Sequence, residues 1–155
     1  MGRFVCAVLL ALATLVPVAA SAGAPEDVAA ALDHWAATFN GNDVEALAKL
    51  YTPDAVFVGT TGSTLIEGND GIRKYFSRLE KSGDKVSIGI RKIVVLDDNV
   101  AYVTGFNEFT ATRNGETRKS PAGFTMVLVK RGDEWLIAHQ HSSRLPKAAD
   151  PRRLT

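Results

Sequence analysis

The spacing of apolar residues divides this chain into a helical first half and a strand-rich second half. In three segments, apolar residues recur every three or four positions, which predicts amphipathic helices over 25–41, 43–52 and 70–81. A proline and two acidic residues begin the first segment, a composition favoured in the first turn of a helix. Two short strands are expected at 55–59 and 65–67, with a turn of small residues between them.

The second half of the chain consists of longer apolar segments separated by short polar turns. The turn at Asn114-Gly115 is the residue pair preferred in tight hairpins. Antiparallel neighbours joined by such turns form a meander, and the helices before it make the whole an α+β domain. The strands expected in this meander cover 85–96, 100–112, 124–130 and 135–143.

Apolar side chains occupy both faces of these strands. Phe124 and Met126 point to one face, whereas Val127 and Val129 point to the other. An antiparallel sheet with one face in water would instead alternate apolar and polar residues. Because three helices can cover only one face, we expect a second copy of the chain to cover the other, in a homodimer through the sheet.

The first 22 residues are typical of a secretory signal peptide. Arg3 supplies a positive charge, residues 4–20 carry none, and an Ala-Ser-Ala sequence then meets the small-residue requirement of signal peptidase. We therefore expect cleavage after Ala22, export to the periplasm or the medium, and no membrane contact afterwards. The alternative is a transmembrane anchor, because the apolar run is about the shortest that spans a bilayer. The mature chain then has one domain over 23–148 and a polar tail over 149–155.

The composition of the mature chain excludes several kinds of site. The only cysteine, Cys6, leaves with the signal peptide, so that no disulfide, thiol nucleophile or thiolate metal site is expected. Loss of Arg3 leaves 17 basic and 17 acidic residues, and this balance disfavours nucleic-acid binding. Neither a nucleotide-binding glycine loop nor a redox residue is found, and no cofactor or metal is expected.

Several local strings, in the order of these elements, resemble one known superfamily. They are Leu-Tyr-Thr-Pro-Asp-Ala at 50–55, Leu-Ile-Glu-Gly at 65–68 with the apolar residues at 72–76, and the tryptophan-to-double-histidine strand at 135–143. This arrangement resembles the nuclear transport factor 2-like (SnoaL-like) superfamily. It is most similar to the association (hub) domain of calcium/calmodulin-dependent kinase II and to SgcJ/EcaC-type bacterial proteins. The resemblance implies a cone-like, curved antiparallel sheet wrapped over three helices, with a cavity at the open end of the cone.

The sequence also departs from its relatives at functional positions. The basic residues that hold a small carboxylate in the hub domain correspond to Ile72, Met126 and Ser142, which are all neutral. The carboxylate base of steroid isomerases corresponds to a position near Gly59. The resemblance therefore implies neither the anion site nor the isomerase base.

The resemblance places a mainly apolar set of side chains around the cavity. Asn107, Gln140 and Ser142 are the few polar anchors among them, so that a neutral, apolar small molecule is the expected ligand. Taken singly, each aromatic residue is better explained as part of the core, and only the set as a whole indicates an apolar cavity. The expected ligand-binding residues are Trp35, Tyr51, Phe57, Tyr75, Asn107, Phe124, Met126, Gln140 and Ser142.

Three residues are candidates for acid–base chemistry. His139 and His141 share one strand face and could act as a general acid and base or as a metal pair, although no third ligand lies at a useful spacing. The alternative is a structural pair at a dimer face or strand end, because a register that turns Ser142 into the cavity turns both histidines outward unless the strand bulges. Glu108 lies in an apolar strand. It could be a base with a raised pKa, and the alternative is a carboxylate that faces solvent at the rim of the strand.

These observations favour an exported, homo-oligomeric SnoaL-like domain that binds a small apolar molecule or serves as an assembly module. The missing carboxylate base and the neutral cavity support this hypothesis over catalysis. The alternative is a cofactor-free lyase, cyclase or isomerase that acts on a small apolar substrate. It requires a carboxylate or histidine that points into the cavity.

Overall fold

Three α-helices and a six-stranded sheet form the part of the chain that the computed structural model describes, residues 23–60 and 62–145. The signal peptide expected over 1–22 and the polar tail expected over 149–155 lie outside these residues. Within the described ranges, no helix is long and apolar enough to cross a membrane. The α+β class expected from the sequence is confirmed.

The first helix follows the sequence pattern closely. α1 (Ala24–Gly41) has Pro25 in its first turn, as expected. It ends where Asn42 adopts a left-handed conformation, with a φ of 58°, and donates its backbone N–H to the carbonyl of Phe39. The side chains that α1 buries recur at helical spacing and are Val28, Leu32, Trp35 and Phe39.

The second helix is shorter than expected, because its last residues join the sheet instead. α2 (Val44–Lys49) was expected to reach residue 52, but β1 (Tyr51–Val58) has already begun there. The carbonyl of Leu50 accepts a hydrogen bond from the backbone N–H of Ile137 at 2.9 Å. This pairing with the last strand replaces another turn of helix.

The third helix also ends earlier than its apolar spacing predicts. α3 (Gly68–Phe76) is followed by one turn of 3₁₀-helix, η1 (Ser77–Leu79), in place of a continuous helix over 70–81. Gly68 has a φ of 66°, a left-handed value that glycine adopts without strain. The chain therefore turns directly from β2 (Ile66–Glu67) into α3.

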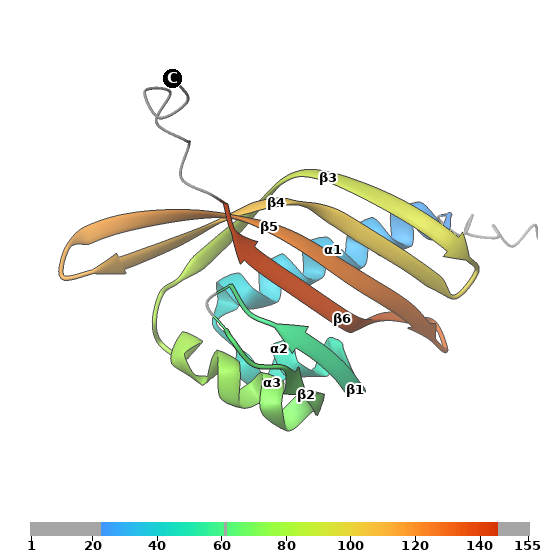
Figure 1. Cartoon of the computed structure of the whole chain (residues 1–155), viewed down its shortest axis with the longest axis horizontal. Helices are drawn as coiled ribbons and strands as arrows, with labels where there is room; N and C mark the ends of the chain where they lie inside the picture. Colours follow the sequence, from blue (N-terminus) through green and yellow to red (C-terminus); the bar gives the residue numbers. More distant parts are fainter. Residues whose placement is uncertain (1–22, 61, 146–155) are drawn as a thin grey trace, which may run out of the picture.

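The strands form one curved, open sheet in the order β2-β1-β6-β5-β4-β3 (Figure 1). Consecutive strands from β3 to β6 pair antiparallel, which confirms the meander. β1 pairs in parallel with β6, so that the sheet is mixed and the expectation of an antiparallel sheet is corrected at this edge. The four long strands are β3 (Lys85–Asp97), β4 (Val100–Arg113), β5 (Glu116–Arg131) and β6 (Glu134–Arg144).

The β4–β5 hairpin extends further than its apolar segments predict. β5 begins at Glu116, well before the expected strand at 124–130, and pairs with the end of β4 across the turn at Asn114-Gly115. Both turn residues have positive φ, 52° and 80°. Residues 116–121 are exposed, so that backbone hydrogen bonds and the turn hold this arm, which projects beyond the rest of the sheet (Figure 1).

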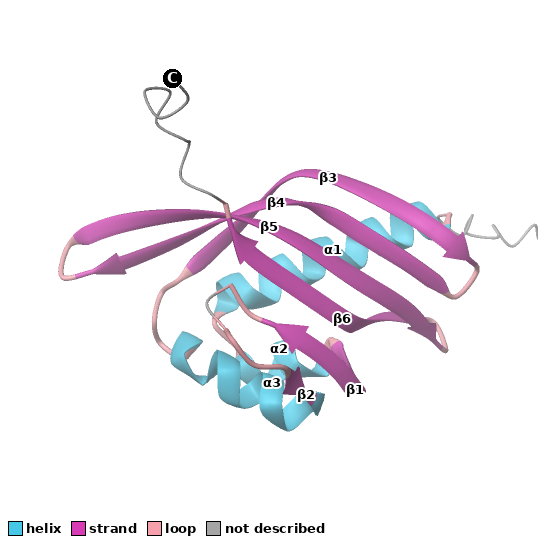
Figure 2. Cartoon of the chain, viewed as in Figure 1, coloured by secondary structure: helices cyan, strands magenta, loops and turns pink. Residues whose placement is uncertain are grey.

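The helices cover one face of the sheet, called the inner face below. α1 lies across β3–β6, and α2 and α3 lie beside β1 and β2 at the edge (Figure 2). The ring of Phe39 on α1 packs against both the sheet and α3. Its centroid lies 5.6 Å from that of Phe109 on β4 and 6.2 Å from that of Phe76 on α3. On the opposite, outer face, Val127 and Val129 are only partly buried.

A bulge in β6 changes which residues face inward. Leu128 on β5 pairs with Ile137, but Val127 pairs with His139, so that Ala138 is an extra residue on β6. Trp135 and Ile137 therefore point inward before the bulge, and Gln140 and Ser142 point inward after it. The bulge allows all four side chains to be buried and turns both histidines to the outer face.

Candidate functional site

A cavity of about 290 Å³ lies between the helices and the inner face of the sheet. α1, β1 and α3 supply most of its aromatic wall, and β4, β5 and β6 close the other side. This volume is at the lower end of the range found for small-molecule sites. The aromatic side chains of the wall are Trp35, Phe39, Phe57, Tyr75, Phe76 and Phe109.

The wall near β1 depends on the absence of a side chain at Gly59. The ring of Phe57 packs 4.7 Å from the ring of Tyr75, between centroids, and Tyr75 reaches over the end of the strand. A Cβ atom on Gly59 would lie 2.3 Å from the phenolic oxygen of Tyr75. Near the position where steroid isomerases carry a base, this chain therefore has a tyrosine ring.

The floor of the cavity is held by a chain of buried hydrogen bonds. The indole Nε1–H of Trp35 donates to the hydroxyl of Tyr51 at 2.9 Å, and that hydroxyl donates to Oε1 of Gln140 at 2.6 Å. Nε2 of Gln140 donates to the hydroxyl of Ser142 at 3.4 Å. Trp35, Gln140 and Ser142 all line the cavity, and Tyr51 lies behind Gln140.

Tyr51 remains a neutral phenol in this position. Burial raises its pKa far above the ordinary value, and the hydrogen bond from Trp35 lowers it by a smaller amount. The hydroxyl therefore keeps its proton and acts as a donor to Gln140 throughout the physiological range.

The mouth of the cavity is positively charged, which corrects the expectation of an uncharged site. Arg78, Arg113 and Arg144 lie around it with one carboxylate, that of Asp84. Arg113 and Asp84 form a bidentate ion pair at 2.6 and 2.9 Å, which raises the pKa of Arg113. Among the described residues, Arg78 and Arg144 form no ion pair.

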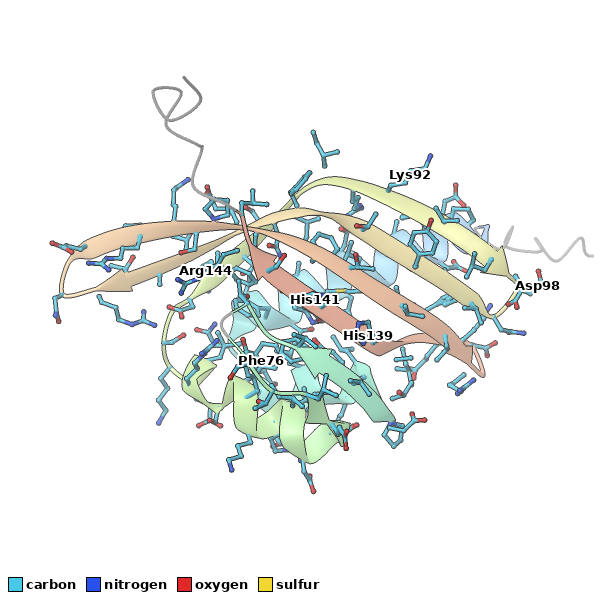
Figure 3. All side chains as sticks on the ribbon, in the orientation of Figure 1. Phe76, Lys92, Asp98, His139, His141 and Arg144 are labelled. Carbon is cyan, nitrogen blue, oxygen red and sulfur yellow. The ribbon has the colours of Figure 1, made fainter. Side chains whose placement is uncertain are left out.

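Arg78 and Arg144 are held differently at the mouth. The guanidinium of Arg78 lies over the ring of Tyr75, with 4.7 Å between its central carbon and the ring centroid, and donates to the phenolic oxygen at 3.1 Å. Arg144 follows Gln140 and Ser142 on the same face of β6. Figure 3 shows it near the end of this strand, and Phe76 of α3 lines the same cavity. The strand β6 therefore extends from the floor of the cavity, at Gln140 and Ser142, to its mouth, at Arg144.

The nine residues expected at the cavity divide into two groups. Trp35, Phe57, Tyr75, Gln140 and Ser142 line it. The other four are buried in the core nearby, without lining the cavity, and are Tyr51, Asn107, Phe124 and Met126. Neither side-chain polar atom of Asn107 has a hydrogen-bond partner among the described residues.

The three candidates for acid–base chemistry lie away from the cavity. His139 and His141 are on the outer side of β6 (Figure 3), where His141 lines a wide groove together with Phe106. Glu108 forms an ion pair with Lys119 at 2.8 Å. In the described part of the chain, no group of three histidine, cysteine, aspartate or glutamate residues could hold a metal ion.

The arginines at the mouth are the part of the site that the sequence pattern did not predict. Arg144 was within reach of prediction, because it is two residues after Ser142 and shares its strand face. Arg78 and Arg113 lie at the end of a helix and of a hairpin, far apart in the sequence. Only the folded chain brings them to one opening.

Known proteins resemble this chain in sequence and structure. Residues 28–147 match the model of the SnoaL-like domain family. A protein from Xanthomonas campestris, described as a calcium/calmodulin-dependent protein kinase II association domain, is 30% identical with a TM-score of 0.76, over 90% of this chain and 100% of that chain. Among curated proteins, none matches.

Two further solved structures share the fold at lower identity. A protein from Novosphingobium aromaticivorans, described as NTF2-like with a cystatin-like fold, is 15% identical with a TM-score of 0.68, over 83% of this chain and 86% of that chain. A ketosteroid isomerase-like protein from Erwinia carotovora atroseptica is 21% identical with a TM-score of 0.69, over 79% of this chain and 97% of that chain. These two likenesses concern the fold alone.

Proposed function

We propose that this chain, which belongs to the SnoaL-like domain family, binds a small molecule whose apolar body lies in the cavity and whose anionic group lies at its mouth. The observation that carries the proposal is the contrast between an aromatic wall and a mouth with three guanidinium groups and one carboxylate. Aromatic rings favour a flat apolar body. Guanidinium groups bind carboxylates through paired, charge-assisted hydrogen bonds.

Arg144 is the group best placed to bind the anion. Arg113 is already paired with Asp84, and Arg78 is held against Tyr75. Arg144 has no ion-pair partner among the described residues and follows Ser142 along the cavity side of β6. A hydrogen bond to a charged group contributes about 1.5–3 kcal/mol, which corresponds to a tenfold or greater gain in affinity.

A matched pair of probes tests this proposal. 2-Naphthoic acid and 2-naphthamide share an aromatic body and differ in charge, and calorimetry should show the acid binding about tenfold more tightly. Arg144→Gln should remove most of this preference. Arg118→Gln is the control, because Arg118 is an exposed arginine on the hairpin arm and does not line this cavity. Equal affinities for acid and amide in the unaltered protein would refute the anionic ligand.

The outer face of the sheet supports a homodimer as part of the same proposal. Phe106 is 52% exposed and Ile90 is 83% exposed, and both line the groove over β3, β4, β5 and β6. A second copy of this face is the proposed occupant, because a two-fold axis lets one apolar patch cover its own equivalent. The 30% identity with a protein described as an association domain also favours self-assembly. Light scattering should give the mass of two chains.

Export is the third element of the proposal. It rests on the pattern of residues 1–22, with one early arginine, a long apolar run and small residues at its end. Expression of the full chain in a Gram-negative host should yield periplasmic protein that begins at Gly23, read from its intact mass. Recovery of full-length chain in the membrane fraction would support an anchor instead.

A cofactor-free lyase or isomerase is the alternative function. It needs a base inside the cavity. Of the described residues that line the cavity, Asp84 is the only carboxylate, and its ion pair with Arg113 holds it at the mouth. Binding without chemistry therefore has the stronger support.

A further inference from the structure

We infer that the floor of the cavity is a hydrogen-bond donor site that selects ligands with a carbonyl oxygen at their buried end. This inference deepens the proposed binding function and rests on it. The two donors are the side-chain amide nitrogen of Gln140 and the hydroxyl of Ser142. Trp35 and Tyr51 fix the direction of both.

The direction of the chain of hydrogen bonds is set at Trp35. The indole N–H is a donor and has no acceptor lone pair for hydrogen bonding. At 2.9 Å, the oxygen of Tyr51 must therefore be the acceptor. Tyr51 has a single hydroxyl hydrogen, and Oε1 of Gln140 lies 2.6 Å away to accept it.

This contact determines which end of the Gln140 amide faces the cavity. If the amide were turned over, its NH₂ group would face the Tyr51 hydroxyl. The tyrosine hydrogen would then lose its acceptor in a place where Tyr51 and Gln140 are each 1% exposed. A buried donor without a partner is strongly unfavourable. The oxygen of Gln140 therefore faces Tyr51, and the NH₂ group faces Ser142 and the cavity.

Ser142 completes the donor site. Its hydroxyl accepts a hydrogen bond from Gln140 at 3.4 Å. Among the described residues, it donates to no protein group, although it is only 3% exposed. Gln140 has a second amide hydrogen as well, so that the floor offers one hydrogen from each residue. Each side-chain oxygen has accepted one hydrogen bond and keeps one lone pair.

A carbonyl oxygen matches this floor better than a hydroxyl or an amine does. It accepts hydrogen bonds from both residues and carries no hydrogen of its own. A hydroxyl leaves one hydrogen unpaired, because only one hydrogen fits between its oxygen and that of Ser142. If the ligand hydroxyl accepts from both residues, its own hydrogen has no partner, and if it donates to Ser142, the hydrogen of Ser142 has none. Sites whose polar groups are left unpaired by a near-isostere discriminate strongly against it.

The position of Arg144 defines the rest of the ligand class. Gln140, Ser142 and Arg144 alternate along one face of β6, and four strand residues span about 13 Å. A flat molecule with a carbonyl at one end and a carboxylate at the other therefore matches both ends of the site. Aromatic or fused-ring keto acids are the simplest members of this class.

Three probes that differ only at the buried end test the inference. They are 6-acetyl-, 6-(1-hydroxyethyl)- and 6-ethyl-2-naphthoic acid, a ketone, an alcohol and a hydrocarbon with the same anion. Calorimetry should show the ketone binding about tenfold more tightly than either of the other two. Equal binding of all three, with the acid still preferred over 2-naphthamide, would overturn the donor floor and leave the proposed function standing. Failure of every acid to bind would overturn the proposed function as well.

Two variants separate the donor floor from a general effect of packing. Ser142→Ala removes one donor and should lower the affinity for the ketone about fivefold to tenfold, with the affinity for the ethyl probe unchanged. Ser143→Ala is the control, because Ser143 is the next residue of β6 and lines the outer groove instead of this cavity. A loss shared equally by the ketone and ethyl probes in Ser142→Ala would contradict the inference.

Tyr51 is a positioning residue that does not line the cavity. Its substitution should therefore change the preference between ketone and alcohol probes without removing a contact with the ligand. Tyr51→Phe frees the Gln140 amide to turn either end toward the cavity. The preference for ketone over alcohol should then fall toward unity, while the ethyl probe binds as before. Retention of the full preference would show that Tyr51 does not set the direction of the amide. If Tyr51→Phe does not fold, Ser142→Ala still tests the donor floor by itself.

Discussion

At the residue scale, the proton held by Tyr51 connects the cavity floor to folding stability. Burial raises the pKa of Tyr51 above its ordinary value of 10.0. Below pH 10 the phenol is protonated in both the folded and the unfolded chain, so that Tyr51 does not reduce the free energy of unfolding. Above it the unfolded chain loses this proton first, so that the free energy of unfolding decreases as the pH rises toward the pKa of the folded state.

Comparison with Tyr51→Phe isolates this contribution. Urea unfolding between about pH 8 and pH 11.5 should show the unaltered protein losing up to about 1.4 kcal/mol more per pH unit above pH 10 than the variant loses. Both proteins share every other tyrosine and lysine, which cancel in the difference. Parallel pH dependence of the two unfolding free energies would show that Tyr51 ionises normally in the folded chain.

The residues of the floor could be predicted from the sequence, but their connections could not. The apolar spacing and the family resemblance predicted Trp35, Gln140 and Ser142 as ligand-binding residues, and all three line the cavity. That they bind a ligand stays a prediction. The bond from Tyr51 to Gln140 joins residues 89 positions apart, and its 2.6 Å length depends on the pairing of β1 with β6. No local pattern contains that information.

At the scale of elements, glycine permits the close approach of β3 and β4. The register between these strands shifts between Ile88 and Arg91, opposite Gly105. A Cβ atom on Gly105 would lie 2.4 Å from the carbonyl oxygen of Ile90 and 2.9 Å from the Cα of Arg91. Both are backbone atoms, which cannot move without disturbing the strand.

Gly105→Ala should therefore destabilise the fold by about 2–3 kcal/mol, measured by urea unfolding. Gly41→Ala is the matched control at the end of α1, where an added Cβ meets nothing within 4 Å. That substitution should be neutral or stabilise by about 0.5–1 kcal/mol. The same small effect from both would show that β3 and β4 tolerate a side chain at the bulge.

The elements themselves were largely predictable, and two of the exceptions have a common cause. β3, β4 and β6 have bounds close to those of their apolar segments. The end of α2 and the bulge at Ala138 differ, because strand pairing decides both. Trp135 and Ile137 are odd-numbered and Gln140 and Ser142 even-numbered, so a regular strand could not turn both pairs inward. The extra residue at Ala138 allows it.

At the scale of the whole molecule, the outer face is where the proposed dimer is tested. Phe106→Glu places a charge in the middle of this face and should convert the dimer to a monomer, measured by light scattering after size-exclusion chromatography. Leu65→Glu is the control, because Leu65 is 65% exposed and lies just before β2, at the other end of the strand order from β3. An unaltered protein that is monomeric at micromolar concentration would exclude the dimer.

The whole-molecule arrangement also explains why the three predicted acid–base candidates are not in the cavity. Side-chain direction alternates along a strand, so that one extra residue at Ala138 sends both histidines to the outer face. Glu108 is held by Lys119 at a distance of 2.8 Å. What reaches the cavity mouth instead is a set of arginines from η1, β4 and β6.

The central claim is that the space beneath α1 and α3 is a ligand site with an anion-binding mouth. A crystal structure of the protein soaked with 2-naphthoic acid tests it most directly. We expect the naphthalene rings between Trp35 and Phe57 and the carboxylate within hydrogen-bond distance of Arg144. Density for the ligand only in the outer groove beside Phe106, or an unfilled cavity at saturating concentration, would contradict it.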